Sequence, residues 1–176
     1  VGVTTLLADL AQAGIHPAGC IVGEPTGMQV MTAHNGMRVY RCCVRGVETH
    51  SSLAPLAVNA IEYAARMIAF IRGLADEVRA SGVRDDKFQV PHTTMQTGLI
   101  AGGTASNIVP RDCEFQFDMR YLPGNDPSQY VERIRRYAED SLLPEMRRVS
   151  EDAGINLELL AEAPDLDTPE DARLAY

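Results

Sequence analysis

His50 is the side chain of this sequence best placed to do chemistry. It stands with Ser51 and Ser52 in a polar stretch between a strand-like run that ends at Arg45 and an apolar-periodic helix that begins near Asn59. An imidazole exchanges a proton near neutral pH, and loops held between rigid elements are common positions for working residues. We therefore expect His50 to act in an active site whose other parts lie largely outside this chain.

Glu24 is a second candidate, because Gly23-Glu24-Pro25-Thr26 directly follows the apolar run Ala18 to Val22, which is typical of a strand buried on both faces. Open α/β sheets place their sites at the carboxyl ends of strands. Glu24 is then either a metal-ligating or catalytic carboxylate, or a solvated turn residue; the four residues alone favour the turn. His34 is read as a turn residue and His92 as a loop residue.

Two more polar side chains, Asn107 and Arg120, lie further along the chain. Asn107 ends the glycine-led turn 102–107, which lacks both the lysine of a P-loop and a GxGxxG pattern, so nucleotide binding is excluded. The small residues of this turn allow close approach to a ligand, to which the Asn107 amide can donate a hydrogen bond. Arg120 stands on the polar face of an alternating strand, where a cross-strand ion pair with an acid is commoner than a ligand contact.

The composition is that of a globular protein, with 45% hydrophobic and 23% charged residues among 176. The net charge of -8 argues against nucleic acid and against an anionic membrane surface as partners. There is no signal peptide, and no apolar run approaches the roughly 18 residues of a membrane span, so a cytoplasmic location is expected. The four cysteines have no CxxC spacing, which favours buried reduced thiols over a zinc cluster or disulfides.

The order of elements predicts an α+β fold. Hydrophobic periodicity predicts helices over 3–13, 58–78 and from Asp126 to a kink or end at Pro144, and strands over 18–22, 28–32, 37–44, 93–100, 113–121 and 155–161. From residue 37 onward this is a ferredoxin-like βαββαβ two-layer sandwich, with two helices on one face of a four-stranded antiparallel sheet. The leading helix and buried strand form half of an α/β unit, which implies neighbours outside the chain.

Five motifs in order resemble one enzyme family. The stretches are VGEPTGMQVMTAHNG, VRGVETHSS, VNAIEYAA, GGTASNIVP and FDMRYLPG, and together they cover nearly the whole chain. They are similar to the M20 family of metallo-aminopeptidases and amidohydrolases. Within it, the wording IVGEPTGMQV, HSSLAP and SNIVPRDCEF is most similar to acetylornithine deacetylases.

The resemblance implies a two-domain enzyme that hydrolyses N-acetylornithine, a small N-acyl amino acid, to ornithine and acetate. A catalytic α/β domain would bind two zinc ions, or cobalt in their place, and an inserted ferredoxin-like lid would form the homodimer. Glu24 matches a zinc-ligating carboxylate of the family. His50 matches the lid histidine that reaches the partner subunit's site and stabilises the oxyanion, and Asn107 and Arg120 match substrate-binding residues of the lid.

The remaining family ligands are missing from the sequence, which has no H-x-D motif, no paired glutamates and no carboxyl-terminal histidine ligand. We read residues 1–35 as a fragment of the zinc-binding catalytic domain, 36–162 as the lid and dimerisation domain, and 163–176 as the return linker. The chain alone is expected neither to hydrolyse amides nor to bind zinc tightly. Two alternatives stay open: an N-succinyl-diaminopimelate or peptide-like substrate, and a non-catalytic ferredoxin-like binding module.

Overall fold

The structure, a computed structural model, describes all residues except 1, 24, 170–171 and 173–176. The chain divides into two compact units, residues 33–167 and residues 1–32 with 168–176. The second of these contains the helix α1 (Gly2–Gln12), which has no buried residue. Gly14 follows it with φ +68, the left-handed conformation that glycine adopts after a helix.

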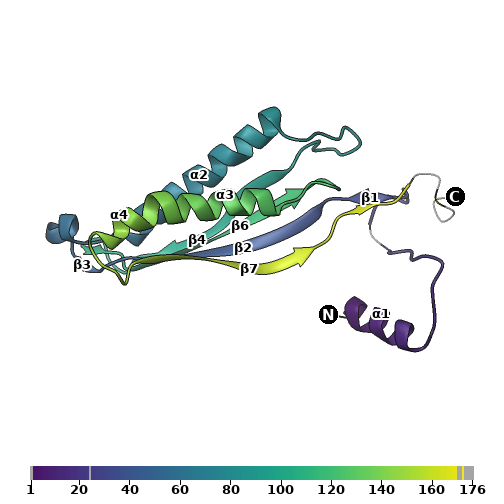
Figure 1. Cartoon of the computed structure of the whole chain (residues 1–176), viewed down its shortest axis with the longest axis horizontal. Helices are drawn as coiled ribbons and strands as arrows, with labels where there is room; N and C mark the ends of the chain where they lie inside the picture. Colours follow the sequence, from purple (N-terminus) through teal and green to yellow (C-terminus); the bar gives the residue numbers. More distant parts are fainter. Residues whose placement is uncertain (1, 24, 170–171, 173–176) are drawn as a thin grey trace. The chain divides into compact units, whose positions relative to one another are not determined.

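The larger unit is the predicted βαββαβ sandwich. Its main elements are β2 (Gly36–Arg45), α2 (Ala60–Ser81), β4 (Thr94–Gly102), β6 (Asp112–Tyr121), a helical segment over 128–147 and β7 (Gly154–Ala163). The four strands form one antiparallel sheet in the order β4-β6-β2-β7. The helices lie on one face of this sheet (Figure 1), so the predicted α+β ferredoxin-like fold is confirmed.

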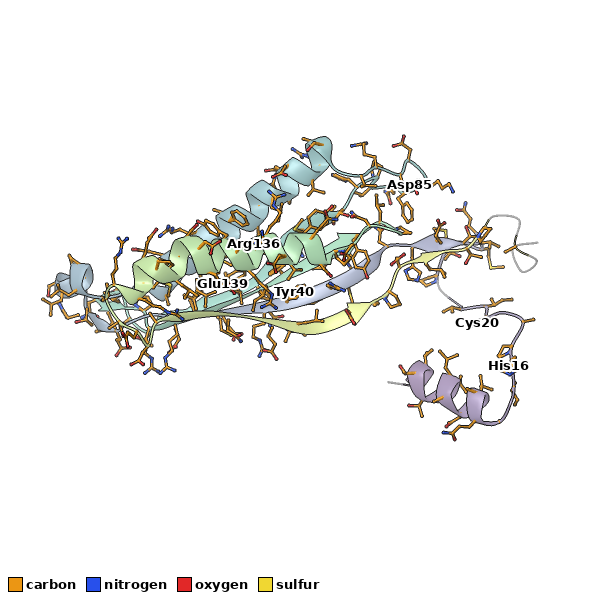
Figure 2. All side chains as sticks on the ribbon, viewed as in Figure 1. His16, Cys20, Tyr40, Asp85, Arg136 and Glu139 are labelled. Atoms are coloured by element: carbon orange, nitrogen blue, oxygen red, sulfur yellow. The ribbon has the colours of Figure 1, made fainter. Side chains whose placement is uncertain are left out.

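The core lies between the sheet and the helices. Alternate residues of β6 from Cys113 to Tyr121 are buried, as the sequence alternation predicted. Tyr40 of β2 points into the same layer (Figure 2) and stacks on Phe117 with ring centroids 5.3 Å apart. The buried stripe of α2 completes the core with Ala60, Ala64, Met67, Ile71, Leu74 and Val78. The opposite face of the sheet, here called the open face, carries polar side chains such as Arg41 of β2, Gln116 of β6 and Glu158 of β7.

Local capping sets where the helices begin. The Asn59 side chain accepts hydrogen bonds from the amides of Ile61 (3.1 Å) and Glu62 (3.3 Å) at the start of α2. Asp126 Oδ1 accepts from the amide of Ser128 at 2.9 Å, where α3 (Ser128–Arg136) begins. None of the helices in the described part of the chain is long and apolar enough to cross a membrane.

Pro144 was predicted to kink or end the second helical segment, and it does not end it; the regular α-helix is interrupted just before the proline. The segment continues from α3 through η2 (Tyr137–Leu142), a π-helical stretch, into α4 (Leu143–Arg147), with Pro144 in the first turn of α4. Proline lacks a backbone donor and clashes with the preceding turn of an α-helix. The wider π turn just before Pro144 accommodates both effects, so the helical path is kept.

The strands predicted over 18–22 and 28–32 are also wrong. Both stretches are irregular, and Ile21 and Met28 are 84% and 100% exposed. A strand needs a neighbour for its backbone groups, and no described strand lies alongside either stretch. Instead β1 (Ala33–His34), which includes a residue predicted in a turn, pairs with β8 (Leu166–Asp167), where an acidic linker was predicted. This short ribbon extends the compact unit beyond 36–162 at both ends.

Among the described residues, two ion pairs join the two helical segments, Arg133 with Glu77 and Arg66 with Glu145, and the second is an acid-sensitive contact. Arg66 of α2 donates to both carboxylate oxygens of Glu145 of α4, at 2.6 and 2.9 Å. These hydrogen bonds lower the pKa of Glu145 from its ordinary value of 4.5. The stabilisation is therefore complete above about pH 4.5 and is lost as the pH falls through the lowered pKa.

Replacing Glu145 by Gln should accordingly destabilise the unit at neutral pH and make little difference in acid. The measurement is urea unfolding of the wild type and Glu145→Gln at neutral pH and at about pH 3, below the ordinary pKa of a glutamate. A difference in unfolding free energy that persists undiminished in acid would contradict the assignment.

Candidate functional site

Two stretches far apart in sequence meet around His50. The short strand β3 (Thr49–His50) pairs with β5 (Ile108–Val109), and His50 lies opposite Ile108. The amide of Ser51 donates to the carbonyl of Asn107 at 2.9 Å. The structure thus brings His50 and Asn107, predicted separately, into one place.

The backbone around this junction is tied to the sandwich on both sides. The amide of Gly46 donates to the carbonyl of Arg111 at 2.6 Å, and the amide of Ala60 donates to the carbonyl of Pro110 at 3.0 Å. Gly46 lies so close to Val58 that a Cβ atom would stand 2.0 Å from the Val58 carbonyl oxygen. The His50 stretch is therefore held by long-range hydrogen bonds, and it is not the simple loop that the sequence predicted.

The His50 ring forms the cap of the next element, the 3₁₀ helix η1 (Ser51–Leu56). Its Nδ1 accepts from the amide of Ser52 at 3.2 Å and lies 2.9 Å from the Ser52 hydroxyl oxygen. The residue is exposed, and Nε2 has no hydrogen-bond partner among the described residues. One ring nitrogen is thus occupied by the chain, and the other is available to a ligand.

A hollow of about 560 Å³ lies beside this junction. Its wall includes Ser51, Asn59 and the glycine-led turn Gly102–Ser106. Gly103 has φ +80, and a Cβ there would come within 3.2 Å of the Ile61 side chain, so this turn requires glycine to lie on α2. The hollow has room for a small molecule.

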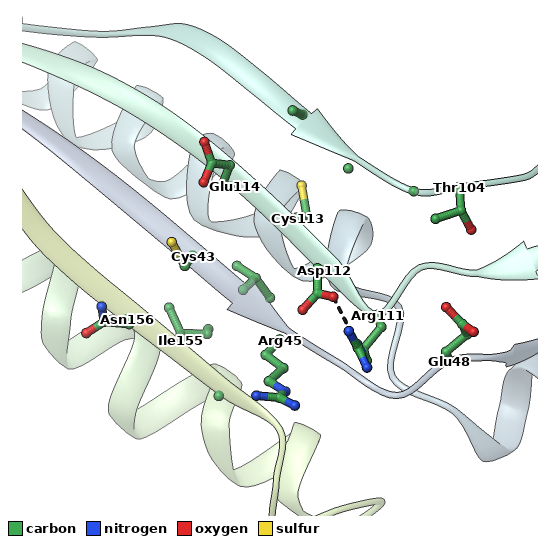
Figure 3. Close-up of a pocket in the computed structure, with 15 residues that line it drawn as sticks. Cys43, Arg45, Glu48, Thr104, Arg111, Asp112, Cys113, Glu114, Ile155 and Asn156 are labelled. Carbon is green, nitrogen blue, oxygen red and sulfur yellow. Dashed lines mark hydrogen bonds and ion pairs between the residues drawn. The ribbon is translucent and has the colours of Figure 1, made fainter.

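A larger hollow of about 720 Å³ lies on the open face of the sheet and shares Gly102–Thr104 with the first (Figure 3). Its charges are mixed: Arg111 donates to Asp112 at 2.9 Å, and Arg45 and Glu48 line the same hollow. Burial, and then the nearby Glu114 carboxylate, raise the pKa of the Cys43 thiol in its wall. This thiol is therefore a poor nucleophile.

Arg120 lies at the opposite end of β6 from His50. It follows Asp112, the first residue of β6, by eight positions, about 26 Å at the usual rise of a strand. Its guanidinium donates to both oxygens of Asp118, with the shortest distance 2.8 Å. Within one chain, Arg120 is thus an ion-pair partner of an acid on the same face, and its substrate-binding role stays a prediction.

A metal site is not formed by the described residues, which contain no group of three or more His, Cys, Asp or Glu side chains that could hold a metal ion. Glu24, the predicted zinc ligand, lies outside the described residues. The zinc ions implied by the family resemblance therefore do not fit any cluster described here.

The sequence model of the peptidase dimerisation domain, M20_dimer, matches residues 32–146. The chain belongs to the M20 peptidase family. Its dimerisation domain, as matched, includes α2, β4 and both stretches of the His50 junction, and it ends before β7.

Curated relatives are members of the same family, and they carry the name of one enzyme within it. The chain is 36% identical over 160 residues to the acetylornithine deacetylase of Myxococcus xanthus, covering 87% of this chain and 42% of the relative. It is also 36% identical over 114 residues to that of Proteus mirabilis, covering 65% of this chain and 29% of the relative. The chain thus spans less than half the length of these relatives.

Solved structures of the family share the fold. Aminopeptidase PepT from Bacillus cereus matches 83% of this chain and 34% of its own, with a TM-score of 0.61 and 20% identity. A tripeptidase from Staphylococcus aureus matches 81% of this chain and 33% of its own, with a TM-score of 0.55 and 17% identity. At these identities the likeness concerns the fold.

Proposed function

We propose that this chain is the lid and dimerisation segment of a zinc-dependent amidohydrolase that hydrolyses N-acetylornithine to ornithine and acetate. The observation that carries the proposal is the β3–β5 junction, which pairs His50 with Ile108 and so holds it near Asn107. Their chain neighbours Ser51, Ser106 and Ile108 line the hollow beside this junction. The names of the curated relatives support the choice of substrate. A longer, cytoplasmic protein would supply the catalytic domain.

The chemistry of this segment would be hydrogen-bond donation. Hydrolysis of an amide places negative charge on the carbonyl oxygen, and donors fixed in advance stabilise that charge. The free ring nitrogen of His50 and the side-chain amide of Asn107 are donors of this kind. Zinc would polarise the same carbonyl. No group of the described residues can hold it, so its ligands other than the predicted Glu24 would come from the remainder of such an enzyme.

Self-association would use the edge strand β4. The sheet has two free edges, β4 and β7. The β7 edge carries Glu162 and Glu158, paired with Arg38 at 3.2 Å and with Arg41 at 3.7 Å. The sequence of β4, TMQTGLIAG, has no charge, and its Leu99 is 63% exposed. Uncharged edges pair readily with another strand, whereas charges protect an edge from pairing.

The outer face of α2, the helix that contacts β4, is a second surface on which a copy of this chain would pack. On α2, Ala65, Ala69 and Gly73 are exposed at four-residue spacing and so share one face. Glycine within a helix costs about 0.5–1 kcal/mol relative to alanine. No described atom lies within 4 Å of where a Gly73 Cβ would be, so the described chain does not require glycine there. Close approach of a second α2 across a twofold axis would require glycine at this position.

The substrate can be tested on the longer protein that contains this sequence. Its kcat/KM should be highest for N-acetylornithine when compared with N-succinyl-diaminopimelate and a dipeptide, and the 176-residue chain alone should give no turnover. Preference for the succinyl substrate or the dipeptide would change the substrate class. No hydrolysis of any of the three would favour a binding module instead.

A further inference from the structure

We propose that Ser52 is a positioning residue, which holds His50 in the tautomer that carries its proton on Nε2. In that tautomer His50 offers a ligand an N–H donor and no basic lone pair. Only the use of this donor on an amide oxygen rests on the proposed function. The tautomer itself follows from the geometry of η1.

The assignment begins with the backbone amide of Ser52. This N–H can only donate, and it points to Nδ1 of His50 at 3.2 Å. Nδ1 must therefore present a lone pair and carry no proton. A neutral imidazole has one N–H, so the proton is on Nε2. The Ser52 hydroxyl, 2.9 Å from the same Nδ1, can then turn its own proton toward it.

A flip of the ring about χ2 is disfavoured, because the fixed backbone keeps the Ser52 amide in place and the flip would take Nδ1 away from it. His50 has extended φ and ψ of -64 and 141 degrees as the cap residue of η1, and it is paired with Ile108 in the short sheet. The next amide, of Ser51, is bonded to Asn107. A flipped ring would leave the Ser52 amide without its side-chain acceptor, which is unfavourable at a helix start.

The consequence is a ligand class. Nδ1 and Nε2 lie on different edges of the imidazole, so the Nε2–H points away from the helix that Nδ1 caps. Its partner must be an acceptor, such as a carbonyl oxygen, a carboxylate or an oxyanion. The opposite tautomer would turn a lone pair toward that oxygen and repel it. His50 thus acts as a donor and not as a general base, and Ser52 acts only through it.

The tautomer can be measured in this chain without any activity. Nitrogen-15 spectra of the histidine rings at about pH 8.5, well above the ordinary histidine pKa, distinguish a protonated from an unprotonated ring nitrogen, and His50→Gln identifies the His50 signals. We expect Nε2 to be protonated and Nδ1 not. A wild-type His50 protonated mainly on Nδ1 would overturn the proposal.

Variants of Ser52 then test whether its hydroxyl helps to set the tautomer of His50. Ser52→Ala should lower the ratio of the Nε2–H to the Nδ1–H form about threefold to tenfold, the range for one hydrogen bond. Ser52→Thr, which keeps the hydroxyl, should restore the ratio, and Ser51→Ala should leave it unchanged. An unchanged ratio in Ser52→Ala, with a folded spectrum, would remove Ser52 from the role.

Kinetics on the longer protein separate this inference from the proposed function. Ser52→Ala should lower kcat about threefold to tenfold with little change in KM, and should have no further effect when His50 is already Ala. An equal loss in both backgrounds would mean a merely structural role for Ser52. If the spectra show the expected tautomer but His50→Ala does not alter turnover, the tautomer assignment stands and the catalytic use of His50 fails.

Discussion

Replacing His50 by Ala should lower kcat/KM for N-acetylornithine about a hundredfold in the longer protein, the usual cost of losing one donor to an oxyanion. The unfolding free energy of this chain should fall by only about 1 kcal/mol, the cost of losing one helix cap. The ring is exposed, and its hydrogen bonds among the described residues reach only the amide and hydroxyl of Ser52. A large loss of rate with a small loss of stability is the pattern of a residue that serves a ligand.

His34→Ala is the matched control. His34 is also exposed, and its ring contacts only the carbonyl of the next residue, Asn35, at 3.1 Å. It belongs to β1, outside the junction of His50 with Asn107. Steady-state kinetics of both variants, with urea unfolding of the corresponding chains, decide the matter. Equal turnover by wild type and His50→Ala would mean that this domain serves dimerisation and takes no part in the chemistry.

The parts of the fold that the sequence predicted correctly are the elements whose hydrophobic repeat continues over many residues. The ten residues of β6 alternate strictly, and the twenty-two of α2 repeat their apolar positions over six turns, so local sequence dictates which face is buried. The run at 18–22 is as apolar as a buried strand, yet it forms none, because a strand depends on a neighbour that local sequence does not reveal.

The sequence predicted the residues of the site but not the strand pairing that brings them together, for a related reason. His50 and Asn107 each stood out by residue type, but the pairs that join them involve strands of two residues, too short to show any period. The cap on η1 gave no signal in the sequence, because its side chain is His50, whereas the usual capping residues are Ser, Thr, Asn and Asp. For Arg120, the alternation gave the correct face, and the acid at position 118 on that face is its partner.

Replacing Leu99 by Glu should dissociate a dimer that forms through β4. The change removes an exposed apolar side chain from each protomer and places two like charges at a shared edge. Burial of a leucine contributes about 1.5–3 kcal/mol. Two copies thus raise the dimer Kd at least about a hundredfold, and repulsion adds to this.

Leu159→Glu is the control that decides which edge is used. Leu159 lies on β7, is 43% exposed, and gains the same charge, so a general effect of net charge appears equally in both variants. Sedimentation velocity across the micromolar range should show dimers for wild type and Leu159→Glu and monomers for Leu99→Glu. The reverse pattern would move the interface to β7. A monomeric wild type over the whole range would mean that β4 does not suffice to join two copies of this chain, and that its exposed apolar residues meet some other surface.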